Sequence, residues 1–361
     1  MDQDKLKLMK ESCLVRFNLF ALRRLIAFGM LFSATAVFAG GLRLVVNPYA
    51  GVDWEKTTQH RANLHTHTVA SGGKLFLSTV YEEYAKRGYT ILAITDHNLC
   101  TRWWKADIDP MKQYGVFPVV GQEYSQGDHV NGYFLDYKTG TGKTDFLIKE
   151  IVGHGGIAVI NHPGRYWKPD AEGKVPRETR NTYMGLLRDN PAVPGIEVLN
   201  RNDRYPWDVA LWDALLEEAM PARPVWGFAN DDMHESDQIG YSWETFLLDE
   251  LNEATFRQAV TEGRFYLSAR GCEESKNLYP PIIQSIRHDP ATRTVVIAAA
   301  SDGEQLKSEN CRWIADGKTV HEGLVLNYGQ VRGLGRYVRA ELTGKGGTTY
   351  TNPFGFSREA P

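Results

Sequence analysis

The sequence predicts an α/β fold, a barrel of strands and helices followed by a small antiparallel β-sandwich, and three observations favour it. Short apolar β-type runs alternate with helical segments before about residue 278, as in sheets built from βαβ units. Histidines and acids stand where these runs end, and barrels place their chemistry at the carboxyl ends of strands. Beyond residue 278 the runs lack helical periodicity, which favours antiparallel sheet.

Length and composition fit one large and one small domain. A chain of 361 residues with 42% hydrophobic residues can bury a full core. We expect the barrel at residues 40–277 and the β-sandwich at 278–361. The formal charge of -3 predicts no nucleic-acid polymer as a partner.

The first 39 residues are typical of an export signal. Basic residues precede the apolar run 25–38, and small residues near Ala39 suit cleavage. The run is shorter than the ~20 residues that a spanning helix needs. We therefore expect a periplasmic or extracellular protein. The alternative is an uncleaved segment that anchors the chain to a membrane.

The four cysteines are too few for a disulfide framework. Cys13 would leave with the signal. Cys272 and Cys311 either form a bridge in an oxidising compartment or remain two buried thiols.

The elements of the barrel can be placed in order. A helix is expected at 79–87, with Thr79 and Glu82 as a capping box and Gly88 as its stop. Further helices are expected at 146–152 and 207–220, and strands at 90–95, 116–120, 156–160, 196–199 and 225–228.

The elements of the tail are all β-type. Strands are expected at 282–287, 294–298 and 337–342, the last alternating at period two. Residues 312–314 and 319–320 flank Asp316-Gly317, which is a hairpin signal.

Six of the ten histidines stand in short motifs, most of them with an acid. The motifs are His65-Thr66-His67, Asp96-His97, Gln122-Glu123, Asp128-His129, Asn161-His162-Pro163 and Asp232-Met233-His234. Each alone is explained equally well by a turn or a surface pair. Their joint occurrence, in order and mostly after β-type runs, predicts a metal-dependent hydrolase.

The spacing of the motifs suggests how ions would be shared. His65 and His67 are two residues apart, so both point to one face of an extended strand. We expect them at a first ion that Asp232 completes, with His162 and His129 at a second, and Glu123 can bridge the two. His97 and His234 either hold a third ion or orient the substrate and donate a proton. Paired ions suit ester hydrolysis because they polarise the substrate and activate water.

At these residues the sequence resembles the PHP (polymerase and histidinol phosphatase) superfamily of metal-dependent phosphoesterases. The resemblance covers roughly residues 55–270. The tail, through Tyr337–Glu341 and Tyr350–Pro353, is similar to the β-domain of the branch that contains carbaryl hydrolase. The resemblance implies a distorted (β/α)7 barrel that holds two or three divalent ions, either Zn or Mn, with Fe as an alternative.

The chain departs from the family at one place. Members usually have Asp or His after the first histidine pair, whereas this chain has Ser71-Gly72-Gly73-Lys74. We therefore expect a site of two ions at rest, with a third as the alternative.

Catalytic and substrate-binding residues follow from the same loops. Asp96, His97 and His234 are the catalytic candidates, although Asp96 can instead cap a turn. Arg165, Lys74 and Arg201 are candidates to bind an anionic substrate, and each is otherwise a solvated surface residue. Glu197 is either a partner of an arginine such as Arg204 or an outer partner of a ligating histidine.

Trp103, Trp104, Tyr166 and Trp167 either line an apolar pocket or pack between the loops and the barrel. The expected function is an exported phosphoesterase that cleaves a small phosphomonoester or phosphodiester. One alternative is a carboxylic or carbamate ester hydrolase on the same ions. Another is a non-catalytic binding protein, against which the full ligand set argues.

Overall fold

The computed structural model describes residues 41–138, 142–201, 203–271 and 278–358. Residues 42–358 belong to one compact unit. The predicted export signal at 1–39 and Cys272 lie outside the described residues, so the signal and the Cys272–Cys311 bridge stay predictions. Cys311 itself is buried. No helix in the described ranges is both long enough and apolar enough to cross a bilayer.

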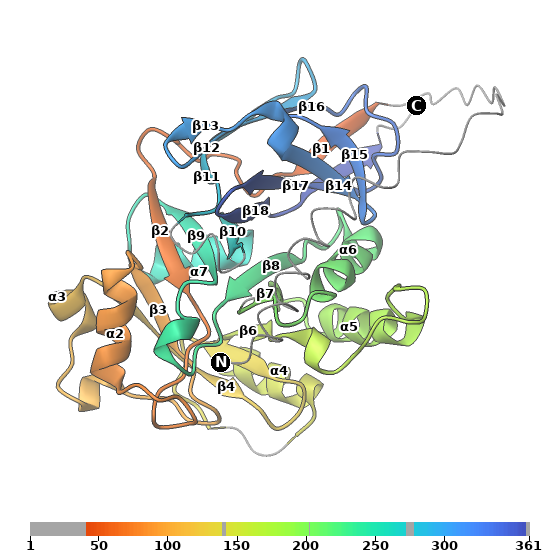
Figure 1. Ribbon diagram of the computed structural model, residues 1–361. Coiled ribbons are helices and arrows are strands. Elements are labelled where there is room, and N and C mark those ends of the chain that lie inside the picture. The colour runs from red at the N-terminus through yellow and green to blue at the C-terminus, as the bar shows by residue number, and fades with distance from the viewer. Residues whose placement is uncertain (1–40, 139–141, 202, 272–277, 359–361) are drawn as a thin grey trace, which may run out of the picture. The chain divides into compact units, whose positions relative to one another are not determined.

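One sheet of fifteen strands carries the barrel and part of the tail (Figure 1). Its strands are β1 (Leu42–Val46), β2 (Thr58–Asn63), β3 (Ile91–Ile94), β4 (Phe117–Tyr124), β5 (Val130–Tyr133), β6 (Ile157–Ile160), β7 (Gly195–Asn200), β8 (Trp226–Asn230), β9 (Ser242–Leu248), β10 (Phe265–Arg270), β14 (Cys311–Ala315), β15 (Lys318–Glu322), β17 (Tyr337–Gly344), β18 (Gly347–Thr351) and β19 (Phe354–Arg358). The pairs β2–β3, β3–β4, β6–β7 and β7–β8 are parallel. β5 runs antiparallel to both β4 and β6, and β9 runs antiparallel to β2.

Helices connect the parallel strands and cover the sheet. They are α2 (Leu77–Lys86), α3 (Pro110–Tyr114), α4 (Thr144–Gly153), α5 (Arg177–Asp189), α6 (Asp208–Ala219) and α7 (Glu253–Glu262), with short 3-10 turns at Trp103–Lys105, Pro163–Arg165, Ser236–Gln238 and Ser308–Asn310. The expected helices are present. The predicted capping box of α2 is wrong, because the helix begins at Leu77, two residues before Thr79, and its N-cap Phe76 makes no side-chain cap.

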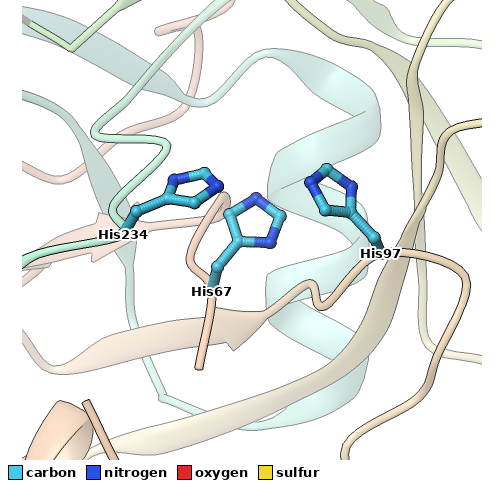
Figure 2. Close-up of side chains that lie close together, drawn as sticks. All are labelled: His67, His97 and His234. Carbon is cyan, nitrogen blue, oxygen red and sulfur yellow. The ribbon is translucent and has the colours of Figure 1, made fainter. Parts of the chain in front are cut away.

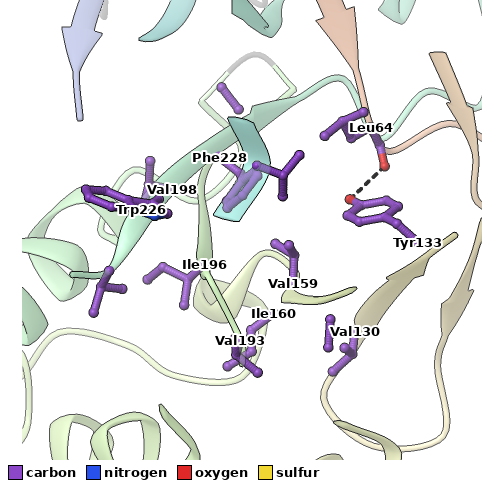
Figure 3. Close-up of a cluster of buried hydrophobic side chains, with 14 of the residues drawn as sticks. Leu64, Val130, Tyr133, Val159, Ile160, Val193, Ile196, Val198, Trp226 and Phe228 are labelled. Atoms are coloured by element: carbon purple, nitrogen blue, oxygen red, sulfur yellow. Dashed lines mark hydrogen bonds between the residues drawn. The ribbon is translucent and has the colours of Figure 1, made fainter. Parts of the chain in front are cut away.

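The barrel core is built from strands that are buried on both faces. Every residue of β7 and β8 is buried, as expected for parallel strands covered by helices. Trp212 and Leu216 from α6 join this core. Figure 3 shows the apolar side chains of β5 to β8 packed together, with the hydroxyl of Tyr133 donating to the carbonyl of Leu64 at 2.9 Å.

The tail is antiparallel, as predicted. β11 (Ile282–Asp289), β12 (Thr294–Ser301), β13 (Glu304–Gln305) and β16 (Val325–Asn327) form a separate four-stranded sheet. The β14–β15 hairpin turns at Asp316 and Gly317, both with positive φ, which is the backbone that a two-residue hairpin requires. The prediction of an α/β fold followed by an antiparallel β region is confirmed.

Buried side-chain contacts, among others, join the tail to the barrel. Arg339 of β17 is 1% exposed and donates to both carboxylate oxygens of Asp213 on α6, at 2.8 and 2.7 Å. Asn352, which follows β18, accepts from the backbone N–H of Gly227 on β8 at 3.0 Å. On the same strand the N–H of Ala229 donates to Glu244 of β9 at 2.9 Å. Side chains therefore accept from backbone N–H groups of β8, which is the strand at one end of the sheet order.

Candidate metal centre

Sharp turns at the ends of three neighbouring strands direct side chains over the barrel mouth. His162, Arg201 and Asp232 follow β6, β7 and β8, and each has a positive φ, at 26°, 52° and 45°. L-residues rarely adopt this backbone, and residues held in it cluster at functional sites. The three loops thus place donors at one end of the sheet.

Glu123 lies at the centre of the site and is fully buried. Its oxygens lie 2.8 to 3.4 Å from nitrogens of five of the six motif histidines, which are His65, His67, His97, His129 and His162. The amide of Asn161 also donates to it, at 3.0 Å. One carboxylate therefore touches almost every imidazole of the motifs.

Asp232 closes the other side of the site. Its Oδ1 lies 3.5 Å from Nε2 of His65, 3.3 Å from Nε2 of His67 and 3.6 Å from Nδ1 of His234. Arg204 donates to its Oδ2 at 3.1 Å. Asp232 is 4% exposed, so it is a nearly buried acid between imidazoles and a guanidinium.

All eight residues expected to hold ions fall into four overlapping groups whose donor atoms lie within 4.8 Å of one another. The groups are His65, His67 and Asp232; His65, Glu123 and His162; His97, Glu123 and His129; and His67, His97 and His234. His129 therefore shares a group with His97 and Glu123, and its ring centre also lies 5.1 Å from that of His162. Figure 2 shows the rings of the last group turned toward one another, from the loops after β2, β3 and β8.

The donor set fits divalent cations. Several buried atoms of the cluster lie within ion-pair distance of a neighbour but make no well-aligned hydrogen bond among the described residues: Nε2 of His65, Nε2 of His67, Nδ1 of His97 and Oε2 of Glu123. Leaving such atoms unsatisfied costs free energy. Imidazoles mixed with carboxylates are the ligands that Zn and similar ions take in hydrolases.

Glu197 of β7 orients the cluster from outside. Its Oε1 lies 3.2 Å from Nδ1 of His65, and its Oε2 accepts from the backbone N–H of His162 at 2.9 Å and from Asn200 at 3.0 Å. A carboxylate on the far nitrogen of a ligating histidine fixes the tautomer and the ring orientation. Of the two roles expected for Glu197, the structure shows the histidine partner.

The charges of the cluster are strongly coupled. Burial would raise the pKa of Glu123, but the charge of His65 and the hydrogen bonds of His129 and His162 hold that pKa well below its usual range. Burial would lower the pKa of His65, yet Glu123, Glu197 and Asp232 raise it well above its ordinary value. Burial lowers the pKa of His67, His129 and His234. In the absence of cations the acids thus hold a proton on His65.

The structure does not bring Asp96 into the donor groups. Asp96 is fully buried and accepts from the N–H and hydroxyl of Thr68 at 2.8 and 2.7 Å, from Ser71 at 2.6 Å and from the hydroxyl of Thr101. With these donors in place it fixes loops. A catalytic role for Asp96 stays a prediction without a contact to support it.

The predicted substrate-binding residues lie in different surroundings. Arg201 donates to the backbone carbonyl of Asp232 and lies 3.3 Å from Nδ1 of His234. Arg165 is exposed, with its guanidinium 5.9 Å from the ring centre of Tyr166. Lys74 pairs with Glu235 at 2.6 Å and is mostly solvent-exposed.

Sequence reasoning missed two contacts of the site. Asn161 was recognised only as part of a motif, and its position directly before His162 was the available signal for its bond to Glu123. The hydroxyl of Tyr166 accepts from the backbone N–H of His129 at 3.1 Å. No local pattern indicates that contact, because it joins loops 37 residues apart.

Of the other aromatic candidates, Trp167 is buried and donates to Asp208, whereas Trp104 is 41% exposed.

Comparisons with known proteins give likenesses of fold. No family model matches the sequence, and no curated protein matches it. A two-domain protein from Bacteroides vulgatus, described as containing a predicted PHP-like metal-dependent phosphoesterase, is 16% identical over 86% of this chain and 98% of that chain, with a TM-score of 0.48. An amidohydrolase from Chromobacterium violaceum, with bound sulfate and no metal, is 16% identical over 56% of this chain and 96% of its own, with a TM-score of 0.40.

A third structure, from Bifidobacterium adolescentis, is described as a metal-dependent phosphoesterase and is 16% identical over 56% of this chain and 96% of its own, with a TM-score of 0.38. The similarity to the carbaryl-hydrolase branch stays a prediction.

Proposed function

We propose that this chain is an exported, metal-dependent phosphoesterase that cleaves a small phosphomonoester or phosphodiester. The supporting observation is the convergence of six histidines, Glu123 and Asp232 into four overlapping groups, in which several buried donor atoms lack a well-aligned hydrogen bond among the described residues. Buried polar groups are normally satisfied. A cluster that leaves several of them open is best explained by cations.

We propose that His65, His67 and Asp232 hold one ion and that Glu123 and His162 hold a second, with His129 as an additional ligand. His97 and His234 hold a third ion or act on the substrate. Zn or Mn suits this mixed nitrogen and oxygen set, with Fe as the alternative. Such ions supply Lewis acidity and activate water for attack on an ester.

The residues of the chain itself would position the substrate. The side chains of His97 and His234 are 31% and 28% exposed, so they face the solvent at the mouth. Burial lowers the pKa of His234, which favours the neutral form of the ring. Arg204 is 44% exposed beside Asp232, where its guanidinium can bind an anionic group. Arg201 fixes the backbone of Asp232.

The first test is metal analysis of the purified protein, followed by turnover of p-nitrophenyl phosphate, bis-p-nitrophenyl phosphate and an aryl carbamate with added Mn or Zn. We expect bound transition metal and hydrolysis of a phosphate ester. His65→Ala and Asp232→Ala should abolish turnover while the fold is retained. His154→Ala is the matched control, because His154 is exposed and lies outside the four groups.

The other readings give different results in the same panel. Carbamate hydrolysis without phosphate ester hydrolysis would favour the carboxylic or carbamate esterase. Tightly bound metal without any turnover would favour the binding protein. Protein without tightly bound metal would contradict both hydrolase readings and would also favour the binding protein. Export is tested separately, by sequencing the N-terminus of the mature protein from the periplasmic or extracellular fraction.

A further inference from the structure

The turn after the first histidine pair brings a serine hydroxyl back to the donor cluster. The N–H groups of Ser71 and Gly73 both donate to the carbonyl of Thr68, at 3.1 and 2.9 Å. Gly72 has a φ of 102°, and a Cβ at Gly73 would lie 2.5 Å from the backbone oxygen of His67. Residues with a side chain rarely adopt such a φ or permit so close an approach. The two glycines therefore let the chain fold back, so that Ser71 faces His67.

The hydroxyl of Ser71 has three contacts, which account for its one proton and its two lone pairs. It donates to Oδ1 of Asp96 at 2.6 Å, because an ionised carboxylate only accepts. It accepts from the backbone N–H of His97 at 2.8 Å, because a backbone N–H only donates. The third contact is Nδ1 of His67 at 3.4 Å. The remaining lone pair of the hydroxyl faces that nitrogen, so Nδ1 is the donor.

This assignment leaves the other nitrogen of His67 available to a cation. A neutral imidazole carries one proton, so a ring that donates from Nδ1 has its lone pair on Nε2. Nε2 lies 3.3 Å from Oδ1 of Asp232 and 3.4 Å from Oε2 of Glu123. Within the described ranges it makes no well-aligned hydrogen bond. The two carboxylates alone would draw the proton to Nε2, where it would oppose a cation, and the Ser71 hydroxyl counters that pull.

We propose that Ser71 is a positioning residue of the metal centre, which links Asp96 to His67 and selects the tautomer that presents Nε2 to a cation. The inference rests on the metal-binding part of the proposed function and adds a residue to it. A carboxylate behind a ligating histidine fixes its ring and its tautomer. Asp96 polarises the hydroxyl that lies between them, which makes the hydroxyl oxygen a stronger acceptor.

Two neighbouring histidines are thus oriented by different means. Nδ1 of His65 faces Glu197 directly, at 3.2 Å, whereas Nδ1 of His67 reaches a carboxylate only through Ser71. The same hydroxyl also holds the backbone of His97. His67 and His97 both belong to the group of three histidines in Figure 2. Loss of one hydroxyl should therefore disturb two of the candidate ligands.

The experiment compares the wild type with the full-length variants Ser71→Ala, Ser71→Thr and Thr101→Val. Ser71→Ala removes the hydroxyl and Ser71→Thr keeps it. Thr101→Val is the matched control, because Thr101 also donates to the carboxylate of Asp96 but, among the described residues, makes no side-chain hydrogen bond to a histidine. The affinity of each protein for Co²⁺ is measured by chelator competition, and circular dichroism verifies the fold.

We expect Ser71→Ala to bind Co²⁺ about tenfold more weakly than the wild type, as is typical when a ligating histidine loses its outer partner. Ser71→Thr and Thr101→Val should stay within about twofold of the wild type. Equal affinity in Ser71→Ala and wild type would overturn the inference. An equal loss in Thr101→Val would trace the effect to the loops around Asp96, and an equal loss in Ser71→Thr would show that the hydroxyl is not the cause; either result would also overturn it.

Proton NMR of the cobalt-loaded proteins tests the tautomer itself. The ring N–H of a ligating histidine gives a strongly shifted signal near Co²⁺, which is lost when the proton exchanges with solvent. The Nδ1–H of His67 donates to Ser71, so its signal should persist in the wild type and in Ser71→Thr. In Ser71→Ala one such signal should be lost to rapid exchange, while Thr101→Val keeps the full set. Identical signals in Ser71→Ala and wild type would rule out the role of Ser71, whatever the affinities.

Failure of the proposed function gives a different result. A wild type that binds Co²⁺ and hydrolyses no phosphate ester would contradict the phosphoesterase. The affinities and the NMR signals still decide about Ser71, because they require no turnover. Absence of Co²⁺ binding to the wild type would refute the inference, because Nε2 of His67 would then have no cation to face.

Discussion

Replacing Glu197 with glutamine should weaken metal binding although Glu197 lies outside the donor groups. In the structure Nδ1 of His65 faces Oε1 of Glu197 at 3.2 Å, and Nε2 faces Glu123 and Asp232. An ion at Nε2 needs the lone pair of that nitrogen, so the proton of the neutral ring must stay on Nδ1. Glu197 accepts that proton, which selects the required tautomer.

Glutamine reverses this preference if its amide keeps accepting from His162. Its oxygen then faces the N–H of His162 and its NH2 group faces Nδ1 of His65. The imidazole must accept at Nδ1, and the proton moves to Nε2, where it opposes a cation. Loss of such an outer partner typically costs 10–100-fold in metal affinity, about 1.4–2.7 kcal/mol.

The assay is chelator competition on metal-loaded protein, with wild type, Glu197→Gln and Glu244→Gln compared. Glu244 is the matched control, because it is also a fully buried glutamate of the sheet, and its carboxylate accepts from the backbone N–H of Ala229 at 2.9 Å. Equal metal affinity in Glu197→Gln and wild type would refute the tautomer argument. Equal loss in both variants would show a general effect of a buried glutamine.

Two further predictions concern stability. Burial raises the pKa of Glu244 well above 4.5, so the folded state keeps a proton that the unfolded chain releases. The free energy of unfolding should therefore fall as pH rises from about 4.5 through the raised pKa. Urea titrations of Glu244→Gln across this range should lack that decline, and a pH dependence equal to that of the wild type would contradict the assignment. Arg339→Met leaves Asp213 buried without its partner and should lower the free energy of unfolding by about 3–5 kcal/mol, whereas Arg339→Met/Asp213→Leu should recover much of the loss in the same assay. A double variant as unstable as the single one would show that the unpaired Asp213 is not the cause and would point to Glu341, the other partner of Arg339.

The parts of the fold that sequence could predict are those with local signals. β3, β6 and β8 are short apolar runs that stop at polar motifs, so both the strands and the donors at their ends were predicted from adjacent residues. The β14–β15 hairpin was predicted because Asp316-Gly317 supplies the backbone its turn requires. These features depend on neighbouring residues, for which periodicity and turn chemistry are direct physical signals.

The parts that were missed depend on distant partners. β5 has the sequence Val-Asn-Gly-Tyr, which carries no strong strand signal, and it exists because β4 and β6 pair with it on both sides. β1 pairs with β19 from the other end of the chain. α5 has a mostly polar sequence and buries only Tyr183 and Leu187 fully.

The candidate site divides in the same way. The donor residues were predicted because their types and order indicate metal chemistry. How they share Glu123, and the pairing of His129 with His97, depends on the approach of five loops in space. Asp96 shows most clearly what the sequence could not predict. Its motif with His97 suggests a catalytic residue, whereas the four hydrogen bonds that it accepts show that it holds the surrounding loops in place.

The bond between Asn352 and Gly227 has a practical consequence for anyone who isolates the catalytic half. Gly227 lies five residues before Asp232, on the strand that delivers it to the mouth. Cutting the chain at the boundary expected near residue 278 would remove Asn352, and with it β18, the strand that pairs with β10. The shortened protein would leave the backbone N–H of Gly227 and the edge of β10 without their partners, close to the strand that positions Asp232. Any loss of activity in it would reflect this loss of support and would say nothing about substrate preference.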